Sequence, residues 1–325
     1  MVVSLGRGHC GAHLSLFFTI YDDERDWEMQ GSTGAGLCLE EGVEAIAKGA
    51  GGGQSLEVIF IDGEHSDEIY KLVREELSRF IPEIMTYDWT LTIRMDLPTS
   101  QGFGMSASGA IAAANAFQRA MGFPHEECLR RSLLVAHIVE RRLSNGLGDT
   151  TALASGGVER RTVAGSPYSG ELLANGPGKS EGWSLRTPLL LCWKDSTGTQ
   201  TSNYIDDPDW REKINDSGIE AMSGVGTGDW DESRWLELFE KSNEFAEKSG
   251  LLMDATRLQL FEDVKRVVDA CGMKDLAFPM LCMLGRSVVI APIDAKSKGE
   301  FLPELEDSLT ECGFNTKIGK VGPLA

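Results

Sequence analysis

The sequence lacks paired cysteines, long apolar runs and a recognisable targeting segment. Its seven cysteines are an odd number and none stands in CxxC spacing, which argues against a zinc cluster and indicates a reduced, intracellular protein. No apolar run approaches the ~20 residues that a membrane-spanning helix needs. The first residues carry neither a basic flank nor a small-residue cleavage site. We therefore expect a cytoplasmic protein with no membrane partner.

Positive charge is also scarce. The chain has 31 Lys and Arg against 50 Asp and Glu, a formal net charge of −19. A nucleic-acid surface needs clustered cations, so this balance argues against nucleic acid as a partner. It does not argue against a nucleotide, because backbone dipoles and Mg²⁺ can meet the charge of a phosphate chain. With 325 residues, the chain is long enough for about two domains.

Residues 98–120 join a strand to a helix through a glycine-rich turn. The preceding segment alternates apolar and polar residues from Trp89 to Asp96, as a half-buried strand does, and residues 107–119 are rich in alanine, as a helix would be. Free N–H groups at a helix N-terminus attract anions, and glycines let a phosphate approach the backbone. A tight turn with a serine cap is the simpler alternative. The predicted phosphate contacts are Gly102, Gly104, Met105, Ser106, Ala107 and Ser108.

Two other glycine patterns resemble nucleotide-binding motifs but lack features that those motifs require. Gly6, Gly8 and Gly11 spell GxGxxG, but the aromatic and β-branched segment 13–21 that follows does not open the helix that a dinucleotide-binding site requires. Residues 178–180 read GKS, the end of a Walker loop, yet Leu173 stands where that loop needs its first glycine. We expect neither a Rossmann site nor a Walker loop.

A second group of polar residues follows the phosphate loop along the chain. His137 and Glu140 are three residues apart, so they share one face of a helix predicted over residues 126–143. Asp149 stands in a glycine-flanked turn before the next helix. Taken singly, a packed histidine, a solvated glutamate and a capping aspartate explain them. Phosphoryl transfer, however, uses such a set: a carboxylate for Mg²⁺, an acid for the attacking hydroxyl, and amides over the phosphates.

These motifs together resemble the small-molecule kinases of the GHMP type, which include galactokinase, homoserine kinase and mevalonate kinase. Their phosphate loop, P-x3-G-x-G-x-S-S/A, is matched from Pro98 to Ala107. Within them the chain is most similar to the archaeal pantoate kinases. The segments that carry this likeness are GAHLSLFF at 11–18, GSTGAG at 31–36, HxxE followed by GLGD at 137–149, FAEKSGLL at 245–252 and MLGRSVVIAP at 283–292.

The resemblance implies a role for each matching residue. Ser106 and Glu140 would bind the Mg²⁺ of ATP, and Asp149 would be the catalytic base. The substrate residues would be Ser32, His137 and Arg161, with His13 and Ser15 from the opening segment. Independently, a guanidinium pairs well with a carboxylate such as that of pantoate. Arg161 could instead be a surface charge near Glu159, and Arg160 competes with it for the role.

The resemblance also implies a two-domain α+β fold. Residues 1–185 would form a ribosomal-protein-S5-like domain that binds ATP, and residues 186–325 a ferredoxin-like domain, with the active site between them. The patterns predict later helices at 232–249, 253–270 and 302–312, and strands at 189–193, 287–291 and 314–318. Residues 165–182 are expected to be an exposed connection, residues 206–209 and 224–231 acidic linkers, and residues 197–201 a polar lid or a surface turn. Residues 37–48 suit a helix or a strand.

The leading functional prediction is ATP- and Mg²⁺-dependent phosphorylation of pantoate to 4-phosphopantoate for coenzyme A synthesis. The first alternative keeps the chemistry but uses mevalonate or a mevalonate phosphate, as a mevalonate 3-phosphate 5-kinase of archaeal isoprenoid synthesis would. The second is a nucleotide-binding protein without turnover. The expected partners are a small hydroxy acid and, as an option, a second copy of the chain in a homodimer. Departures from the pantoate kinase pattern at Gly11, Ser15 and Leu16 put the acceptor in question, and no lysine precedes Lys48.

Overall fold

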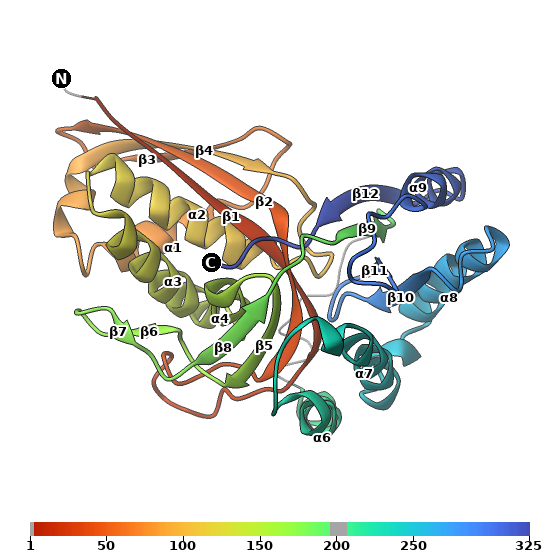
Figure 1. Ribbon diagram of the computed structural model, residues 1–325. Coiled ribbons are helices and arrows are strands. Elements are labelled where there is room, and N and C mark those ends of the chain that lie inside the picture. The colour runs from red at the N-terminus through yellow and green to blue at the C-terminus, as the bar shows by residue number, and fades with distance from the viewer. Residues whose placement is uncertain (1–2, 196–206) are drawn as a thin grey trace.

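The computed structural model describes residues 3–195 and 207–325 of the chain. They form two large sheets with helices packed on them and a third sheet of only two short strands (Figure 1). The segment 197–201, for which the sequence suggested a lid or a surface turn, lies outside the described residues. In the described part of the chain, no helix is both long enough and apolar enough to cross a membrane.

The first sheet has six strands in the order β3-β4-β2-β5-β8, with β1 also paired to β2. The β3 and β4 strands are parallel to each other, and the other pairs are antiparallel. Strand β2 is long enough to pair with β4 along one part of its edge and with β5 along another. The strands are β1 (Val3–Phe18), β2 (Gly34–Gly51), β3 (Leu56–Phe60), β4 (Tyr87–Met95), β5 (Val158–Val163) and β8 (Lys179–Trp183).

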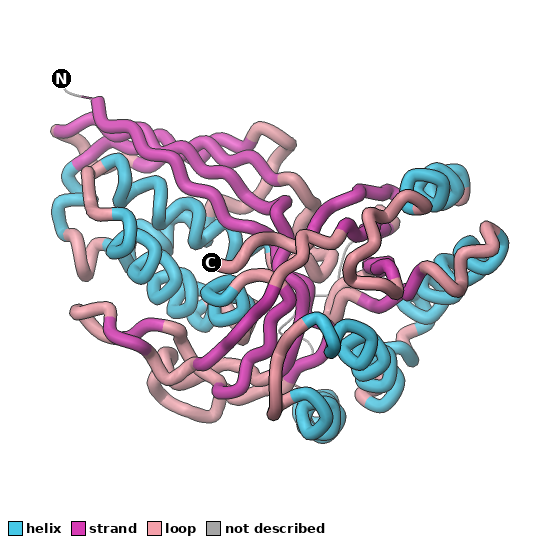
Figure 2. Tube along the Cα trace, viewed as in Figure 1, coloured by secondary structure: helices cyan, strands magenta, loops and turns pink. Residues whose placement is uncertain are grey.

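One face of this sheet is covered by helices (Figure 2). The Ala-rich helix α2 packs directly on β1, because a Cβ atom at Gly6 or Gly8 would lie only 2.1 or 2.0 Å from a carbonyl oxygen of α2. The N-terminal glycines therefore allow close packing of strand and helix, which confirms that they are not a dinucleotide-binding loop. The helices are α1 (Glu68–Leu77), α2 (Met105–Ala120), α3 (His125–Arg142) and α4 (Asp149–Ser155).

The second sheet has four antiparallel strands in the order β10-β11-β9-β12. With helices between β9 and β10 and again between β11 and β12, this is the ferredoxin-like arrangement that was predicted. Its strands are β9 (Pro188–Trp193), β10 (Ala277–Leu281), β11 (Ser287–Pro292) and β12 (Asn315–Lys320), and its helices are α6 (Pro208–Val225), α7 (Trp235–Lys248), α8 (Ala255–Ala270) and α9 (Leu302–Glu311).

Several local expectations were wrong or incomplete. Segment 13–21 opens no helix, as expected: β1 continues to Phe18 and pairs with β2 across two register shifts. Segment 37–48 is strand. Residues 165–182 are not a plain connection: they contain the short pair β6 (Tyr168–Ser169) and β7 (Ala174–Asn175) and most of β8. Helix α6 was not expected: it spans the stretch between the two expected linkers and takes in the end of the first and the start of the second. Asp207 caps its first turn by accepting from the N–H groups of Asp209 and Trp210.

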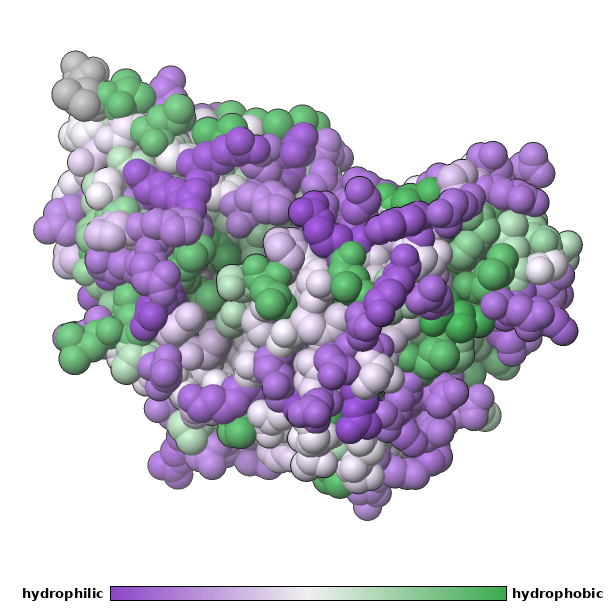
Figure 3. Space-filling model, in the orientation of Figure 1, coloured by the Kyte–Doolittle hydropathy of each residue, from purple (hydrophilic) through white to green (hydrophobic). Residues whose placement is uncertain are grey.

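The predicted domain boundary at residues 185 and 186 falls between β8 and β9. The chain then returns at its end to the first sheet, where Val321 pairs with Leu39 and Leu324 with Gly156. Hydrophilic side chains cover much of the face seen in Figure 3, in keeping with the charge of −19. The first sheet nevertheless exposes apolar side chains, such as Leu5 of β1 and Ile59 of β3.

Candidate active site

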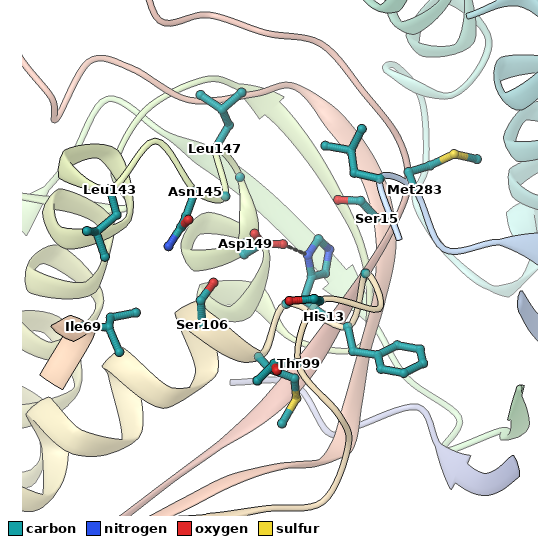
Figure 4. A pocket seen from close by; sticks show the side chains of 18 of the residues that line it. His13, Ser15, Ile69, Thr99, Ser106, Leu143, Asn145, Leu147, Asp149 and Met283 are labelled. Carbon is teal, nitrogen blue, oxygen red and sulfur yellow. Dashed lines mark hydrogen bonds and ion pairs between the residues drawn. The ribbon is translucent and has the colours of Figure 1, made fainter. Parts of the chain in front are cut away.

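A cavity of about 490 Å³ lies where the phosphate loop, the start of α1, the α3–α4 connection and the β10–β11 turn meet. Figure 4 shows apolar Ile69 and Leu143 at one end and Ser15 and Met283 at the other. Asp149 and the ring of His13 lie between the two ends. The cavity can therefore hold a nucleotide base at its apolar end and a small acceptor at the other, with the acidic group between them.

The phosphate loop has the conformation that its sequence predicted. Gly104 adopts a left-handed conformation (φ 60°) and caps α2, which begins at Met105. Gly102, Gly104, Met105 and Ser106 line the cavity. The first N–H groups of α2 have no partner within the helix, so an anion in the cavity would meet them together with the positive end of the helix dipole.

Two residues of the predicted loop do not line the cavity. Ala107 and Ser108 are fully buried. The Ser108 hydroxyl is close to the carbonyl oxygens of Gly11 (2.6 Å) and Gly104 (3.0 Å). Its side chain therefore ties the loop to β1, and the geometry favours a structural role for it over a phosphate contact.

The second sheet contacts both the phosphate loop and the adjacent strand β1. The hydroxyl of Ser287 donates to the carbonyl of Gln101 at 2.5 Å. The N–H of Met283 donates to the carbonyl of Ser15 at 3.1 Å. A Cβ atom at Gly102 would lie 3.0 Å from the backbone of the β10–β11 turn. This turn is part of the MLGRS segment singled out from the sequence. The segment therefore packs against the phosphate loop.

Ser106 lines the cavity and contacts Glu140, which is buried behind it and is not itself among the lining residues. The Ser106 hydroxyl and the backbone N–H of Gly146 each donate to Oε2 of Glu140 at 3.0 Å. Oε1 of Glu140 is buried and has no hydrogen-bond partner among the residues that the structure describes. Burial, followed by repulsion from Asp149, raises the pKa of Glu140 to about 7. An orphaned buried carboxylate oxygen beside a serine hydroxyl fits a hard divalent cation.

Asp149 is the first residue of α4 and is paired with His13 from β1. Oδ1 of Asp149 lies 2.5 Å from Nδ1 of His13 (Figure 4). Burial alone would raise the pKa of Asp149, but the hydrogen bond and charge of His13, with the charge of Arg161, hold it below its usual value. The side chain keeps 17% of its surface exposed. Asp149 is therefore an ionised carboxylate with access to the cavity.

Behind His13 lies a residue that sequence reasoning missed. Oε1 of Glu159 is 3.0 Å from Nε2 of His13 and is also paired with Arg161. No local pattern of the sequence indicates this contact, because it depends on the strand register that places Glu159 of β5 opposite Gly36 of β2. Without the strand register, Glu159 had been considered only as a surface neighbour of Arg161.

Of the predicted substrate residues, Ser32, His13 and Ser15 line the cavity. Arg161 lies just behind the wall, since a Cβ atom at Gly148 would be 2.1 Å from Oγ of Ser32 and 2.7 Å from Nε of Arg161. Arg161 is fully buried, and its Nε and Nη2 atoms have no hydrogen-bond partner within residues 3–195 and 207–325. Two nitrogens of this guanidinium, which lies close to Ser32, therefore have N–H groups without an acceptor.

His137 is not brought to the cavity wall. Its ring nitrogens lie 3.0 Å from the hydroxyl of Thr150 and 3.0 Å from the carbonyl of Trp27. Burial lowers its pKa to about 4, so the ring is neutral. The geometry favours a supporting role for His137, in which it links α3 to the start of α4 and to the segment before Ser32.

The remaining arginines that could serve a charged acceptor are engaged elsewhere. Arg160 donates to Glu181 and to the backbone carbonyls of Val225, at the end of α6, and Gly228, just after it. Arg142 pairs with Glu75 and Glu76. Arg141 donates to Gln30 and Asn145. None of the three is among the residues that line the cavity.

Comparison with known proteins agrees with this architecture. Residues 67–157, which hold the phosphate loop, Glu140 and Asp149, match the family described as the GHMP kinases N terminal domain. A solved structure described as a phosphotransferase related to the CoA biosynthesis pathway superimposes with a TM-score of 0.76 at 21% identity, covering 99% of this chain and 98% of that one. Mevalonate kinase from methicillin-resistant Staphylococcus aureus superimposes with a TM-score of 0.61 at 17% identity, covering 98% and 99%.

Residues 67–157 therefore carry a GHMP kinase N-terminal domain, and the comparisons together indicate a small-molecule kinase, that is, an ATP-dependent phosphotransferase. They favour this function over that of a nucleotide-binding protein without turnover. Two curated relatives are named pantoate kinase. That of Methanospirillum hungatei is 26% identical over 86% of this chain and 84% of its own length. That of Thermococcus kodakarensis is 30% identical over 50% of this chain and 54% of its own length.

Proposed function

We propose that this kinase transfers the γ-phosphoryl group of ATP to the primary hydroxyl of pantoate, giving 4-phosphopantoate and ADP in the cytoplasm as a step of coenzyme A synthesis. The observation that carries the proposal is the set of polar groups at the acceptor side of the cavity. There an ionised Asp149 stands beside Ser32, and the unpaired N–H groups of Arg161 lie beneath. This set offers a base for one hydroxyl and a cationic partner for one carboxylate.

Asp149 acts on the acceptor hydroxyl. It accepts the proton as the hydroxyl oxygen bonds to the γ-phosphorus, and the bond from that phosphorus to the bridging oxygen of ADP breaks. The amides at the start of α2 bind the phosphate oxygens and keep the γ-phosphoryl group in line with the hydroxyl. The proton leaves Asp149 for solvent, because its side chain is partly exposed.

Magnesium would be bound by Ser106 and Glu140 together with oxygens of ATP. The described residues contain no cluster of three or more His, Cys, Asp or Glu side chains suited to a metal. A site that shares its ion with phosphates needs only one or two protein ligands, which is usual for Mg²⁺. When bound, the ion neutralises charge on the phosphates.

Ser32 and Arg161 would recognise the acceptor carboxylate, and the apolar groups of the cavity would contact its two methyl groups. Met283, Leu284, Leu147 and Phe18 line the cavity and supply such surface. A phosphorylated acceptor would need further cations, yet Arg141, Arg142 and Arg160 are held by other partners. This favours an unphosphorylated hydroxy acid over a mevalonate phosphate.

The substrate is tested by following ATP conversion to ADP with pantoate, mevalonate, mevalonate 3-phosphate, mevalonate 5-phosphate and homoserine in separate reactions, with products identified by mass spectrometry. We expect turnover of pantoate. In addition, Ser32→Ala should raise the KM for pantoate about tenfold without changing the KM for ATP, whereas Ser223→Ala on exposed α6 should change neither. Turnover of a mevalonate phosphate alone would overturn the substrate but keep the chemistry.

A further inference from the structure

Both ring nitrogens of His13 face carboxylates. Nδ1 lies 2.5 Å from Oδ1 of Asp149, and Nε2 lies 3.0 Å from Oε1 of Glu159, while the whole residue is 1% exposed. An ionised carboxylate only accepts hydrogen bonds, and a neutral imidazole has a single N–H to donate. Only the doubly protonated imidazolium can donate to both partners at once.

Charge balance in the buried cluster points the same way. Asp149 and Glu159 contribute two negative charges, and Arg161 contributes one positive charge. Nη1 of Arg161 lies 3.2 Å from Nε2 of His13 because both nitrogens are paired with the same atom, Oε1 of Glu159, which can accept from both. A protonated His13 brings the four groups to neutrality, whereas a neutral ring would leave a net charge buried. The thiol of Cys38, which also faces the cluster, has its pKa raised well above its usual value by burial and remains uncharged.

The backbone around the ring is shaped for these contacts. A Cβ atom at Gly36 would lie 2.7 Å from Nε2 of His13 and 3.0 Å from Oε1 of Glu159. A Cβ atom at Gly104 would lie 2.9 Å from the carbonyl oxygen of His13 and 3.2 Å from its Cβ. Two of the glycine motifs of the sequence thus converge on this one residue: Gly36 leaves space for the ring and its partner Glu159, and Gly104 leaves space for the backbone of His13.

We propose that His13 is a positioning residue that stays protonated in the folded enzyme and, anchored by Glu159, holds Asp149 ionised and aimed into the cavity. The ring also brings a buried positive charge beside the reacting hydroxyl in a chain with no lysine before Lys48. The proton taken from the acceptor goes to Asp149, and His13 keeps both of its own. Only the role of Asp149 as base rests on the proposed function.

The electrostatics of the ring support this assignment. Burial alone would lower the pKa of His13, but the hydrogen bonds and charges of Asp149 and Glu159 together outweigh burial and raise it. His137 is the internal contrast, because it is equally buried but meets a hydroxyl and a carbonyl in place of carboxylates, and its pKa falls to about 4. One chain therefore holds two buried histidines in opposite protonation states.

The direct test is nitrogen NMR of the ¹⁵N-histidine-labelled full-length protein, which has five histidines. His13→Asn and His137→Asn assign the two buried rings, and His9→Asn, at an exposed position on the same strand as His13, is the control. We expect both His13 nitrogens to remain protonated from about pH 6 to above pH 7, with His137 neutral throughout. A neutral His13 ring at pH 7 would overturn the proposal. This readout needs no turnover, so a failure to phosphorylate pantoate leaves it intact.

Kinetics separate positioning through charge from simple packing. His13→Asn should lower kcat at least tenfold at neutral pH and move the acid limb of the kcat/KM profile to higher pH, because Asp149 loses its cationic partner. His13→Lys, which restores a cation, should recover part of kcat and return the acid limb toward its wild-type position. Equal losses at every pH in both variants would contradict the proposal. If neither variant folds, His137→Asn still assigns the neutral buried ring, and the wild-type spectrum then shows whether another of the five rings stays doubly protonated above pH 7.

Discussion

The hydroxyl of Ser106 donates to Oε2 of Glu140 at 3.0 Å, which leaves Oε1 of the same carboxylate buried without a partner among the described residues. Ser106 lies in the first turn of α2, directly after the phosphate loop, and Glu140 lies in the last turn of α3, 34 positions later. Ser106 lines the cavity where the phosphates of ATP are proposed to bind, and Glu140 lies directly behind it. A cation bound here would give Oε1 of Glu140 a partner and would also neutralise charge on the phosphates.

The first prediction concerns the pH dependence of magnesium binding. The pKa of Glu140 is raised to about 7 in the protein without metal, so below about pH 7 the ion must displace a proton. The apparent affinity for Mg²⁺ with ADP should therefore fall up to tenfold per pH unit as the pH drops below that value. Calorimetric titration at several pH values measures this apparent affinity. Glu140→Gln should bind weakly at every pH, and Glu212→Gln on exposed α6 should follow the wild type.

The second prediction separates two serines of the same helix. Ser106→Ala removes the proposed metal ligand and should weaken magnesium binding with little change in the free energy of unfolding. Ser108→Ala removes a buried hydroxyl that binds Gly11 and Gly104, and it should lower the free energy of unfolding by roughly 1–3 kcal/mol. Urea unfolding and metal titration of both variants test this. Equal effects of the two changes on metal affinity would remove the distinction.

The third prediction concerns the proposed base. Asp149→Asn keeps the size of the side chain but cannot accept the proton, so kcat should fall by about 10²–10⁴ while ATP binding is retained. Fluorescence or calorimetric titration with ATP and a steady-state assay are sufficient to test it. Asp216→Asn, exposed on α6, is the matched control. A variant that stays near the wild-type rate would remove Asp149 from the mechanism.

The fourth prediction concerns stability in acid. The folded-state pKa of His137 is about 4, below the ~6.5 of an unfolded chain, so between these values the unfolded state binds more protons. The free energy of unfolding should therefore fall as the pH drops from about 6.5 to about 4, by about 3 kcal/mol in total from this group. Urea unfolding across this range should show a shallower slope for His137→Asn, whereas His125→Asn at an exposed position should keep the wild-type slope.

Much of this architecture could be predicted because its signals are local. The alternation of Trp89, Leu91 and Ile93 gave β4, and the glycine turn before the Ala-rich helix gave the phosphate loop. The family resemblance gave the ferredoxin-like second half. Helix α6 was missed because acidic and turn-forming residues at its start hid the apolar spacing of Ile214, Ala221 and Val225.

The parts of the site that were missed depend on pairing between distant segments. Glu159 joins His13 across 146 positions, through the register of β5 with β2. Neither residue has a local pattern that indicates the contact. The placement of His137 away from the cavity likewise follows from its contact with the carbonyl of Trp27, 110 positions away. Spacing within a helix predicts that two side chains share a face, but not which face meets the cavity.

The central claim is that pantoate is the acceptor, and an internal competition tests it most directly. Equimolar pantoate and mevalonate are incubated with limiting ATP and magnesium in one vessel, and the phosphorylated products are quantified by mass spectrometry, so that their ratio gives the ratio of kcat/KM values. We predict 4-phosphopantoate in large excess, with the phosphate on the primary hydroxyl. A product mixture dominated by phosphomevalonate would contradict the account.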